Sequence, residues 1–296
     1  MRIHILGNEY AGSGNAGRIM EEIRLLLNNH EVTSSYTEKN PGNFINFIEK
    51  NLDIKYLITV GGDGTINYAV QALAGKDIVL VPVPAGTGSD LSRTIGRVNI
   101  KEIPEIISTG KFRNIDLGLV HINGESRYFI NIMESGLGGM VMERVNSIRH
   151  RSGLTFIHAI LSCIMKMKPV MSDIEIEKEI FHENIIDIII ANGQYYGKGI
   201  HASPESLIDD GFLDVHIIKY MPKIRILFKL LSLRNGTYIR DKYVINRKAK
   251  KISVNCNSIV EIDGETINAN TFSIESCHNA LKLFQESGNI SLNKLK

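Results

Sequence analysis

The stretch Thr59–Asn67, "TVGGDGTIN", begins inside an apolar run and continues into a helical pattern. Glycine-rich loops between a buried strand and a helix typically present backbone amides to phosphate groups. Asp63 stands in the middle of this loop, where its charge would repel a phosphate. The charge is explained if a cation such as Mg²⁺ lies between the two, or if Asp63 accepts a proton during phosphoryl transfer. The alternative is that Asp63 only caps the helix that starts near Thr65.

Strands and helices alternate on both sides of this loop, and the pattern predicts a parallel sheet covered by helices. In such sheets ligands bind at the carboxyl ends of the strands, where the glycine-rich loops leave. The predicted strands are 2–6, 31–37, 55–60 and 77–83, and the predicted helices are 18–29, 41–51, 66–75 and 89–95.

From about residue 113 the pattern changes to short strands joined by turns, which indicates an antiparallel, sandwich-like second domain. Only 140–150, 155–167 and 222–233 have helical periodicity there. We expect an α/β domain over 1–120 and a β-sandwich over 121–284. The polar tail 285–296 either frays or packs back on the first domain.

The composition limits the classes of function. The chain has 296 residues, of which 43% are hydrophobic and 22% charged, with a net charge of +2. This balance gives no global electrostatic case for nucleic acid, although a local basic face for a membrane remains open. Cys163, Cys256 and Cys277 have no metal-ligand spacing and suit a reducing cytosol. The N-terminus lacks the pattern of a signal peptide, so a cytoplasmic protein is expected.

Two further loops leave predicted strands at the same sheet edge. "NEYAGSG", Asn8–Gly14, is able to line an anion site but lacks the P-loop lysine, and a plain turn is the alternative. "PAGTGSDLSR", Pro84–Arg93, contains a second acid, Asp90, although alone it could be a turn and a helix cap. Two acids converging on glycine-lined loops indicate a metal–nucleotide site.

Taken in order, these motifs resemble the soluble lipid kinases related to diacylglycerol and sphingosine kinases, over nearly the whole chain. "GGDGTIN" matches that family's nucleotide signature, which NAD kinases and phosphofructokinases share in similar form. Glu9, Ala11 and Ser89 depart from the family pattern, since they stand where it has proline, serine and asparagine. Further blocks follow in the family's order: "IDLG" at 115–118, "ANGQYYGKG" at 191–199, "PESLIDDGFLDV" at 204–215 and "EIDGE" at 261–265.

The resemblance implies an ATP-dependent kinase with a nucleotide-binding domain of the NAD kinase/diacylglycerol kinase type and a β-sandwich. It implies Mg²⁺ as cofactor, with Asp63 and Asp90 in an acidic cluster. The residues implied for ATP binding are Asn8, Glu9, Tyr10, Ala11, Gly12, Thr37, Gly61, Gly62, Asp63, Gly64, Thr65, Ile66, Asn67 and Thr87.

The resemblance also gives roles to residues of the second domain. Glu265 falls at the place of the proton acceptor, although "IDGE" alone favours a tight hairpin turn. Asp210, with backbone oxygens of Leu207 and Phe212, falls where bacterial members hold a structural Mg²⁺, and there too the residues alone indicate only a turn. Asp116 is a candidate for binding the acceptor head group, or it simply begins a strand.

The acceptor implied by the resemblance is a lipid hydroxyl at a membrane surface, and the expected acceptor is the hydroxyl of diacylglycerol. The segment 222–242 combines apolar and basic residues and is either a membrane-surface helix or a helix packed on the sandwich. The segment 153–165 is either the lip of an acyl-chain pocket or a core helix. We therefore expect a cytoplasmic, peripherally membrane-associated lipid kinase, with a homodimer left open. The alternatives are a kinase of another lipid or of a soluble acceptor such as NAD, and a catalytically silent lipid- or nucleotide-binding regulator.

Overall fold

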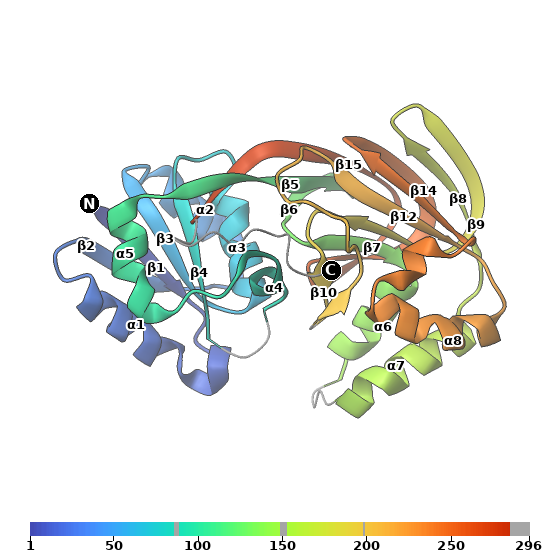
Figure 1. Cartoon of the computed structure of the whole chain (residues 1–296), viewed down its shortest axis with the longest axis horizontal. Coiled ribbons are helices and arrows are strands. Elements are labelled where there is room, and N and C mark those ends of the chain that lie inside the picture. Colours follow the sequence, from blue (N-terminus) through green and yellow to red (C-terminus); the bar gives the residue numbers. More distant parts are fainter. Residues whose placement is uncertain (86–88, 149–152, 198, 285–296) are drawn as a thin grey trace. The chain divides into compact units, whose positions relative to one another are not determined.

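The computed structural model describes residues 1–85, 89–148, 153–197 and 199–284 of the chain. The chain divides into two compact units (Figure 1), one made of residues 1–115 with the segment from Asn279, the other of Asp116–His278. It passes from the first unit to the second within β5, Phe112–Ile122, and returns within β15, Glu265–Phe284. The expected tail 285–296 lies outside the described residues.

The first unit is built around a parallel sheet with the strand order β4-β3-β1-β2, and the last residues of β15 add to it beside β4. Its strands are β1 Arg2–Gly7, β2 Glu31–Tyr36, β3 Ile54–Gly61 and β4 Val79–Pro84. Its helices are α1 Ala16–Leu26, α2 Pro41–Glu49, α3 Asp63–Leu73, α4 Asp90–Ile95 and α5 Ile103–Thr109, with short 3₁₀ turns at Ala11–Gly14 and Ile100–Glu102.

The sequence explains this arrangement. The central strand β3 is apolar along almost its whole length and is buried on both faces. Right-handed crossovers from β1 to β2 and from β2 to β3 run in opposite directions, so α1 and α2 lie on opposite faces. Accordingly α1 contacts α5 on one face and α2 contacts α3 on the other. Helix α5 was not predicted; three β-branched isoleucines and a proline make its seven residues weakly helical by propensity.

The second unit is antiparallel. Its strands, besides the shared β5 and β15, are β6 Glu125–Phe129, β7 Ile132–Gly136, β8 Val170–Ile176, β9 Glu179–Ala191, β10 Tyr195–Tyr196, β11 Ile200–His201, β12 Leu213–Lys219, β13 Val244–Ala249 and β14 Lys251–Ile262. Its helices are α6 Leu137–Asn146, α7 Gly153–Lys166 and α8 Lys223–Arg234, with a 3₁₀ turn at Thr237–Arg240.

Two long strands connect the layers of this unit. Strand β14 pairs with β8 through its first half and with β7 through its second half, and β9 does the same with β8 and β7. Their inward side chains form one apolar core, while a second layer of contacts joins α6, α7 and α8 to the outer face of the sheet. The expected fold class, an α/β domain plus an antiparallel sandwich, is confirmed. No helix among the described residues is long and apolar enough to cross a bilayer.

Candidate active site

The sheet edge of the first unit brings the predicted phosphate loops together. Asn8 N donates to Val60 O at 3.1 Å, so the loop after β1 lies against the end of β3. Thr37 follows β2 at the same edge, because its N–H donates to Gly7 O at 2.8 Å. The carboxyl ends of neighbouring parallel strands therefore place the loop after β1 beside the "GGDGT" loop and Thr37 beside the end of β1.

Glycine is required at two points of this edge. Gly12 has φ 59°, and a Cβ there would lie 2.3 Å from Ala85 O in the loop after β4. A Cβ at Gly61 would lie 2.1 Å from Thr65 Oγ1. Ala85 N in turn donates to Gly61 O at 3.0 Å, so the three loops form one closely packed layer.

The other residues implied for ATP binding differ in their solvent exposure. Tyr10 and Glu9 are exposed, whereas the Ile66 side chain is 3% exposed and belongs to the core. Ala11 lies in the first 3₁₀ turn, and Gly62, Gly64 and Asn67 lie at the start of α3. Thr87 falls outside the described residues. Among these residues Glu9 and Tyr10 of the first loop and Gly64 in the first turn of α3 are exposed, whereas Thr65 and Ile66 are buried.

Asp63 joins two helix starts. It is the first residue of α3, where the N-cap is Gly62 and no side chain caps the helix. The Asp63 carboxylate instead accepts hydrogen bonds from Ser89 Oγ at 2.8 Å, Asp90 N at 2.9 Å and Leu91 N at 3.3 Å. Asp63 thus stabilises the first turn of α4 and ties the "GGDGT" loop to the residues that follow 86–88.

This tie places the two predicted acids on adjacent loops. Asp90 is 6% exposed, and Arg93 Nε lies 3.7 Å from its Oδ1. Carboxylate oxygens are the hard donors that Mg²⁺ prefers, and this ion commonly takes one or two carboxylates together with water and substrate phosphates. The donor chemistry of Asp63 and Asp90 therefore fits Mg²⁺. No group of three His, Cys, Asp or Glu side chains suited to a metal occurs in the described part of the chain.

In the second unit, Glu265 follows a firmly held hairpin turn. The turn residue Asp263 has φ 45°, and its carboxylate accepts hydrogen bonds from three successive amides, those of residues 130–132, at 2.9–3.2 Å. Glu261 accepts a further bond from Gly264 N. The Glu265 side chain is 74% exposed, and its Oε2 lies 2.9 Å from Arg127 Nη1. A rigid turn therefore presents an accessible carboxylate, as a proton acceptor requires.

Asp116 forms hydrogen bonds with the backbone of the turn at 208–211. Its side chain is fully buried, with Oδ2 accepting from Gly211 N at 2.6 Å and Oδ1 lying 2.7 Å from His278 Nδ1. Its own N–H donates to Ile208 O at 2.6 Å. These contacts give Asp116 a structural part, and its role toward an acceptor stays a prediction.

At the position predicted for the structural metal, the ammonium group of Lys248 forms an ion pair with Asp210. Lys248 Nζ lies 2.6 Å from Asp210 Oδ2, and Phe212 N donates to Asp210 Oδ1 at 3.0 Å. Asp214 adds a second carboxylate 3.8 Å from the same ammonium group. The Lys248 ammonium group thus already neutralises the Asp210 carboxylate, so this arrangement does not fit a metal ion held by Asp210 with Leu207 and Phe212.

Three buried acids were missed by the sequence reasoning. Glu134 on β7 stands directly opposite Glu261 on β14, and Asp187 on β9 pairs with Gly136 of the same β7. All three are at most 5% exposed. An acid inside an apolar strand, as in "INIMESG" and "IIDIII", is the signal that could have revealed two of them.

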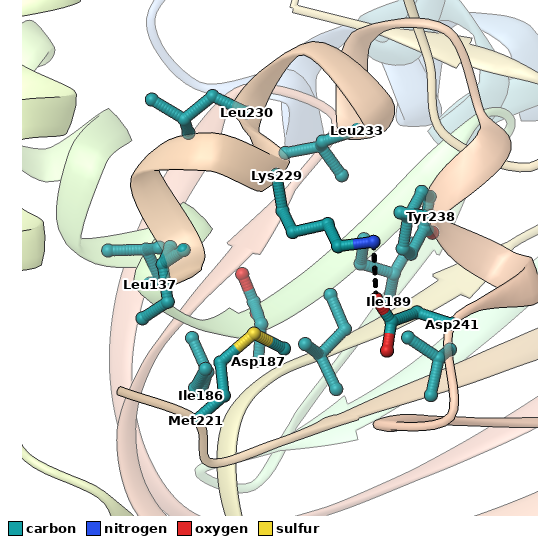
Figure 2. A pocket seen from close by; sticks show the side chains of 13 residues that line it. Leu137, Ile186, Asp187, Ile189, Met221, Lys229, Leu230, Leu233, Tyr238 and Asp241 are labelled. Carbon is teal, nitrogen blue, oxygen red and sulfur yellow. Dashed lines mark ion pairs between the residues drawn. The ribbon is translucent and has the colours of Figure 1, made fainter. Parts of the chain in front are cut away.

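Burial controls the protonation of these acids. It raises the pKa of Glu134 and Glu261 well above the usual value; for Glu134 the charges of Asp187 and Glu261 add to the effect. Burial also raises the pKa of Asp187 to about 7, although Gly138 N donates to its Oδ2 at 2.8 Å. Asp187 borders a mostly apolar cavity of about 70 Å³ beneath α8 (Figure 2), which explains why its carboxylate is poorly solvated.

Both units of the chain are similar to known protein families. Residues 2–120 match the diacylglycerol kinase catalytic domain, and residues 131–285 match the YegS C-terminal NAD kinase beta sandwich-like domain. The chain belongs to the diacylglycerol kinase and YegS family of lipid kinases. It is 29% identical over 217 residues to a diacylglycerol kinase of Mycobacterium tuberculosis, covering 71% of this chain and 70% of the relative.

Solved structures share the fold of this lipid kinase. A diacylglycerol kinase from Bacillus anthracis superposes with a TM-score of 0.69 at 19% identity, covering 97% of each chain. An NAD kinase from Archaeoglobus fulgidus, solved in complex with ATP, gives a TM-score of 0.57 at 14% identity, covering 97% of this chain and 94% of the other. Asp63 and Asp90 lie in the catalytic-domain match, and Glu265 lies in the sandwich match.

The buried Asp187 predicts an unusual pH dependence of the lipid kinase's stability. The folded state holds the proton up to about pH 7, whereas the unfolded chain releases it near pH 4. The contribution of the protonated Asp187 to the stability of the folded state is therefore complete below about pH 4, falls as the pH rises toward 7 and is lost above pH 7. Asp187→Asn keeps an acceptor for Gly138 N but removes the titrating group. We expect the change in the free energy of unfolding caused by this substitution to be more favourable at pH 8 than at pH 4.5, by roughly 1–3 kcal/mol.

Urea unfolding of the wild type and Asp187→Asn at both pH values measures this difference. Glu175→Gln, at an exposed carboxylate on β8 of the same unit, is the matched control and should leave the pH dependence unchanged. An Asp187→Asn protein whose pH dependence equals that of the wild type would contradict the assignment of the buried proton.

Proposed function

We propose that this lipid kinase transfers the γ-phosphoryl group of Mg·ATP to the hydroxyl group of diacylglycerol and forms phosphatidic acid. The observation that carries the proposal is the Asp63 tie, which sets two carboxylates beside glycine loops at the phosphate-binding edge of a parallel sheet. The match of this unit to a diacylglycerol kinase catalytic domain supports the choice of acceptor. The ATP held by the structurally similar NAD kinase supports the choice of donor.

The reaction needs few covalent steps. The lipid oxygen forms a bond to the γ-phosphorus, the bond from that phosphorus to the β–γ bridging oxygen breaks, and ADP leaves with that oxygen. The lipid hydroxyl loses its proton to a carboxylate, which we assign to Glu265, with Asp63 as the alternative acceptor. Mg²⁺, held by Asp63 and Asp90, would neutralise charge on the phosphates.

The partners follow from the substrate. Diacylglycerol resides in bilayers, so we propose that the kinase works in peripheral contact with a membrane. Net charge of +2 spread over the whole chain gives no case for nucleic acid as a partner.

Phosphoryl transfer from [γ-³²P]ATP tests the acceptor. Purified protein is incubated with vesicles that contain diacylglycerol, with vesicles of a total lipid extract, and with NAD in solution. We expect label in phosphatidic acid at a rate at least tenfold above the label in any other product. Label confined to a different lipid would keep the kinase but overturn diacylglycerol as the acceptor, whereas ATP binding without transfer to any acceptor would support a silent regulator.

One observation favours a second candidate, a kinase of NAD. The fold of the chain also superposes on the Archaeoglobus fulgidus NAD kinase. The same assay separates the two, because label in NADP with none in lipid would establish the second candidate.

A further inference from the structure

Helices α7 and α8 expose apolar side chains in regular stripes. On α7, Ile157, Leu161 and Met165 are 55%, 41% and 65% exposed, and their spacing of four residues places them on one face. On α8, Ile224, Phe228 and Leu231 are 60%, 79% and 72% exposed, with the helical spacing of four and three residues. Such repeated exposure of large apolar residues marks an interaction surface rather than scattered surface positions.

The two helices form one outer layer of the second unit. Ile164 of α7 and Ile226 of α8 are buried in the same apolar cluster, and Lys223 Nζ donates to Met165 O at 2.6 Å. Figure 1 shows α7 and α8 along the same side of this unit. With their inner faces packed toward the sheet, the exposed stripes belong to the opposite, outward side of both helices.

The segments that carry the stripes contain only basic charged residues, and the acids that pair with some of them, Asp241 and Glu183, lie outside these segments. The segments 153–169 and 219–240 contain no Asp or Glu, but they contain eight Lys or Arg: Lys166, Lys168, Lys219, Lys223, Arg225, Lys229, Arg234 and Arg240. Asp241 pairs with Lys229 at 2.6 Å and with Arg225 at 3.8 Å. Lys166, Lys168 and Arg234 are exposed and border the apolar stripes at the ends of the helices.

Apolar stripes rimmed by cations match the interface of an anionic bilayer. Apolar side chains enter the headgroup region, while lysine and arginine meet the negative surface potential. A second copy of the chain is a poorer partner, because a two-fold contact would place like charges of this face against each other. We propose that the outward face of α7 and α8 is the surface by which this protein docks on anionic membranes. The proposal rests on the lipid acceptor of the proposed function.

Flotation of the full chain with vesicles tests the proposal without turnover. Vesicles of phosphatidylcholine with about a third phosphatidylglycerol are used, with no ATP and no diacylglycerol. We expect Phe228→Ser/Leu231→Ser to lower the vesicle-bound to free ratio at least about tenfold, because two exposed apolar side chains lose their contact with the interface. Lys166→Gln/Lys168→Gln should lower the same ratio and weaken its dependence on salt.

Met171→Ser/Ile180→Ser is the matched control, since these residues are 61% and 63% exposed on strands β8 and β9 of the same unit. We expect this control to bind vesicles as the wild type does. Equal binding by Phe228→Ser/Leu231→Ser and the wild type would overturn the proposal. So would a loss of self-association without a loss of vesicle binding, because it would assign the face to a second copy.

Phosphorylation of a short-chain diacylglycerol in detergent micelles distinguishes this proposal from the proposed function. The docking variants should retain that activity, because the micellar substrate does not require an anionic bilayer. If no variant and no wild type phosphorylates the lipid, the acceptor is wrong, yet the flotation result still decides the docking surface by itself.

Discussion

Glu265→Gln is expected to lower kcat by about two to four orders of magnitude, while ATP affinity and the fold are retained. Glutamine has nearly the same shape but does not accept the hydroxyl proton, and general base catalysis contributes about 10²–10⁴-fold to rate. The side chain is largely exposed and makes an ion pair with Arg127. Since exposed ion pairs contribute only about 0–1 kcal/mol to stability, unfolding would not explain such a loss.

Glu125→Gln is a closely matched control for this experiment. Glu125 Oε2 lies 3.2 Å from Arg127 Nη2, so its replacement also removes a carboxylate from the same guanidinium group. We expect Glu125→Gln to change kcat by less than about threefold. Steady-state rates at saturating ATP and lipid measure both variants. A Glu265→Gln enzyme with near-normal turnover would show that Glu265 is not the base and would move the role to Asp63.

The sequence predicts the architecture well because its signals are local. Apolar strands, helix periodicity and glycine loops are read within windows of about ten residues, and right-handed crossovers then fix the sheet. The same reasoning predicts that the loops after β1, β3 and β4 meet at one edge, and the structure confirms this for the described residues. The weakly helical α5 escaped prediction because propensity alone does not specify so short a helix.

What the sequence could not supply is pairing between distant residues. Glu134 and Glu261 become neighbours only because β7 and β14 pair in one register, although they are far apart in the chain. Lys248 reaches Asp210 for the same reason, from the strand beside β12. The roles of Asp63 and Glu265 in catalysis are still predictions, since geometry supports them without testing turnover.

Asp63→Asn is expected to abolish transfer, with kcat lowered by at least about 10³-fold. Two effects combine. Asparagine lacks the negative charge that attracts Mg²⁺, and its amide NH₂ would face one of the groups that now donate hydrogen bonds to the Asp63 carboxylate. Purified variant, assayed over a range of Mg²⁺ concentrations with ATP and lipid fixed, measures the loss. Near-normal transfer by the variant would refute a catalytic role for Asp63.

Ser89→Ala separates the two effects. It removes the 2.8 Å bond from Ser89 Oγ to Asp63 and the N-cap of α4, but it leaves the carboxylate in place. If the tie between the loops were the whole contribution of Asp63, both variants would lose activity to a similar degree. If the charge matters most, Ser89→Ala should lose less than about thirtyfold in activity, since a cap and one hydrogen bond contribute about 1 kcal/mol each and about 2 kcal/mol corresponds to about thirtyfold in rate. Its Mg²⁺ dependence should also match that of the wild type, whereas residual activity of Asp63→Asn should require more Mg²⁺. If the Asp63 carboxylate both joins the loops and faces the metal, Asp63→Asn should therefore lose more activity than Ser89→Ala, and only Asp63→Asn should require more Mg²⁺.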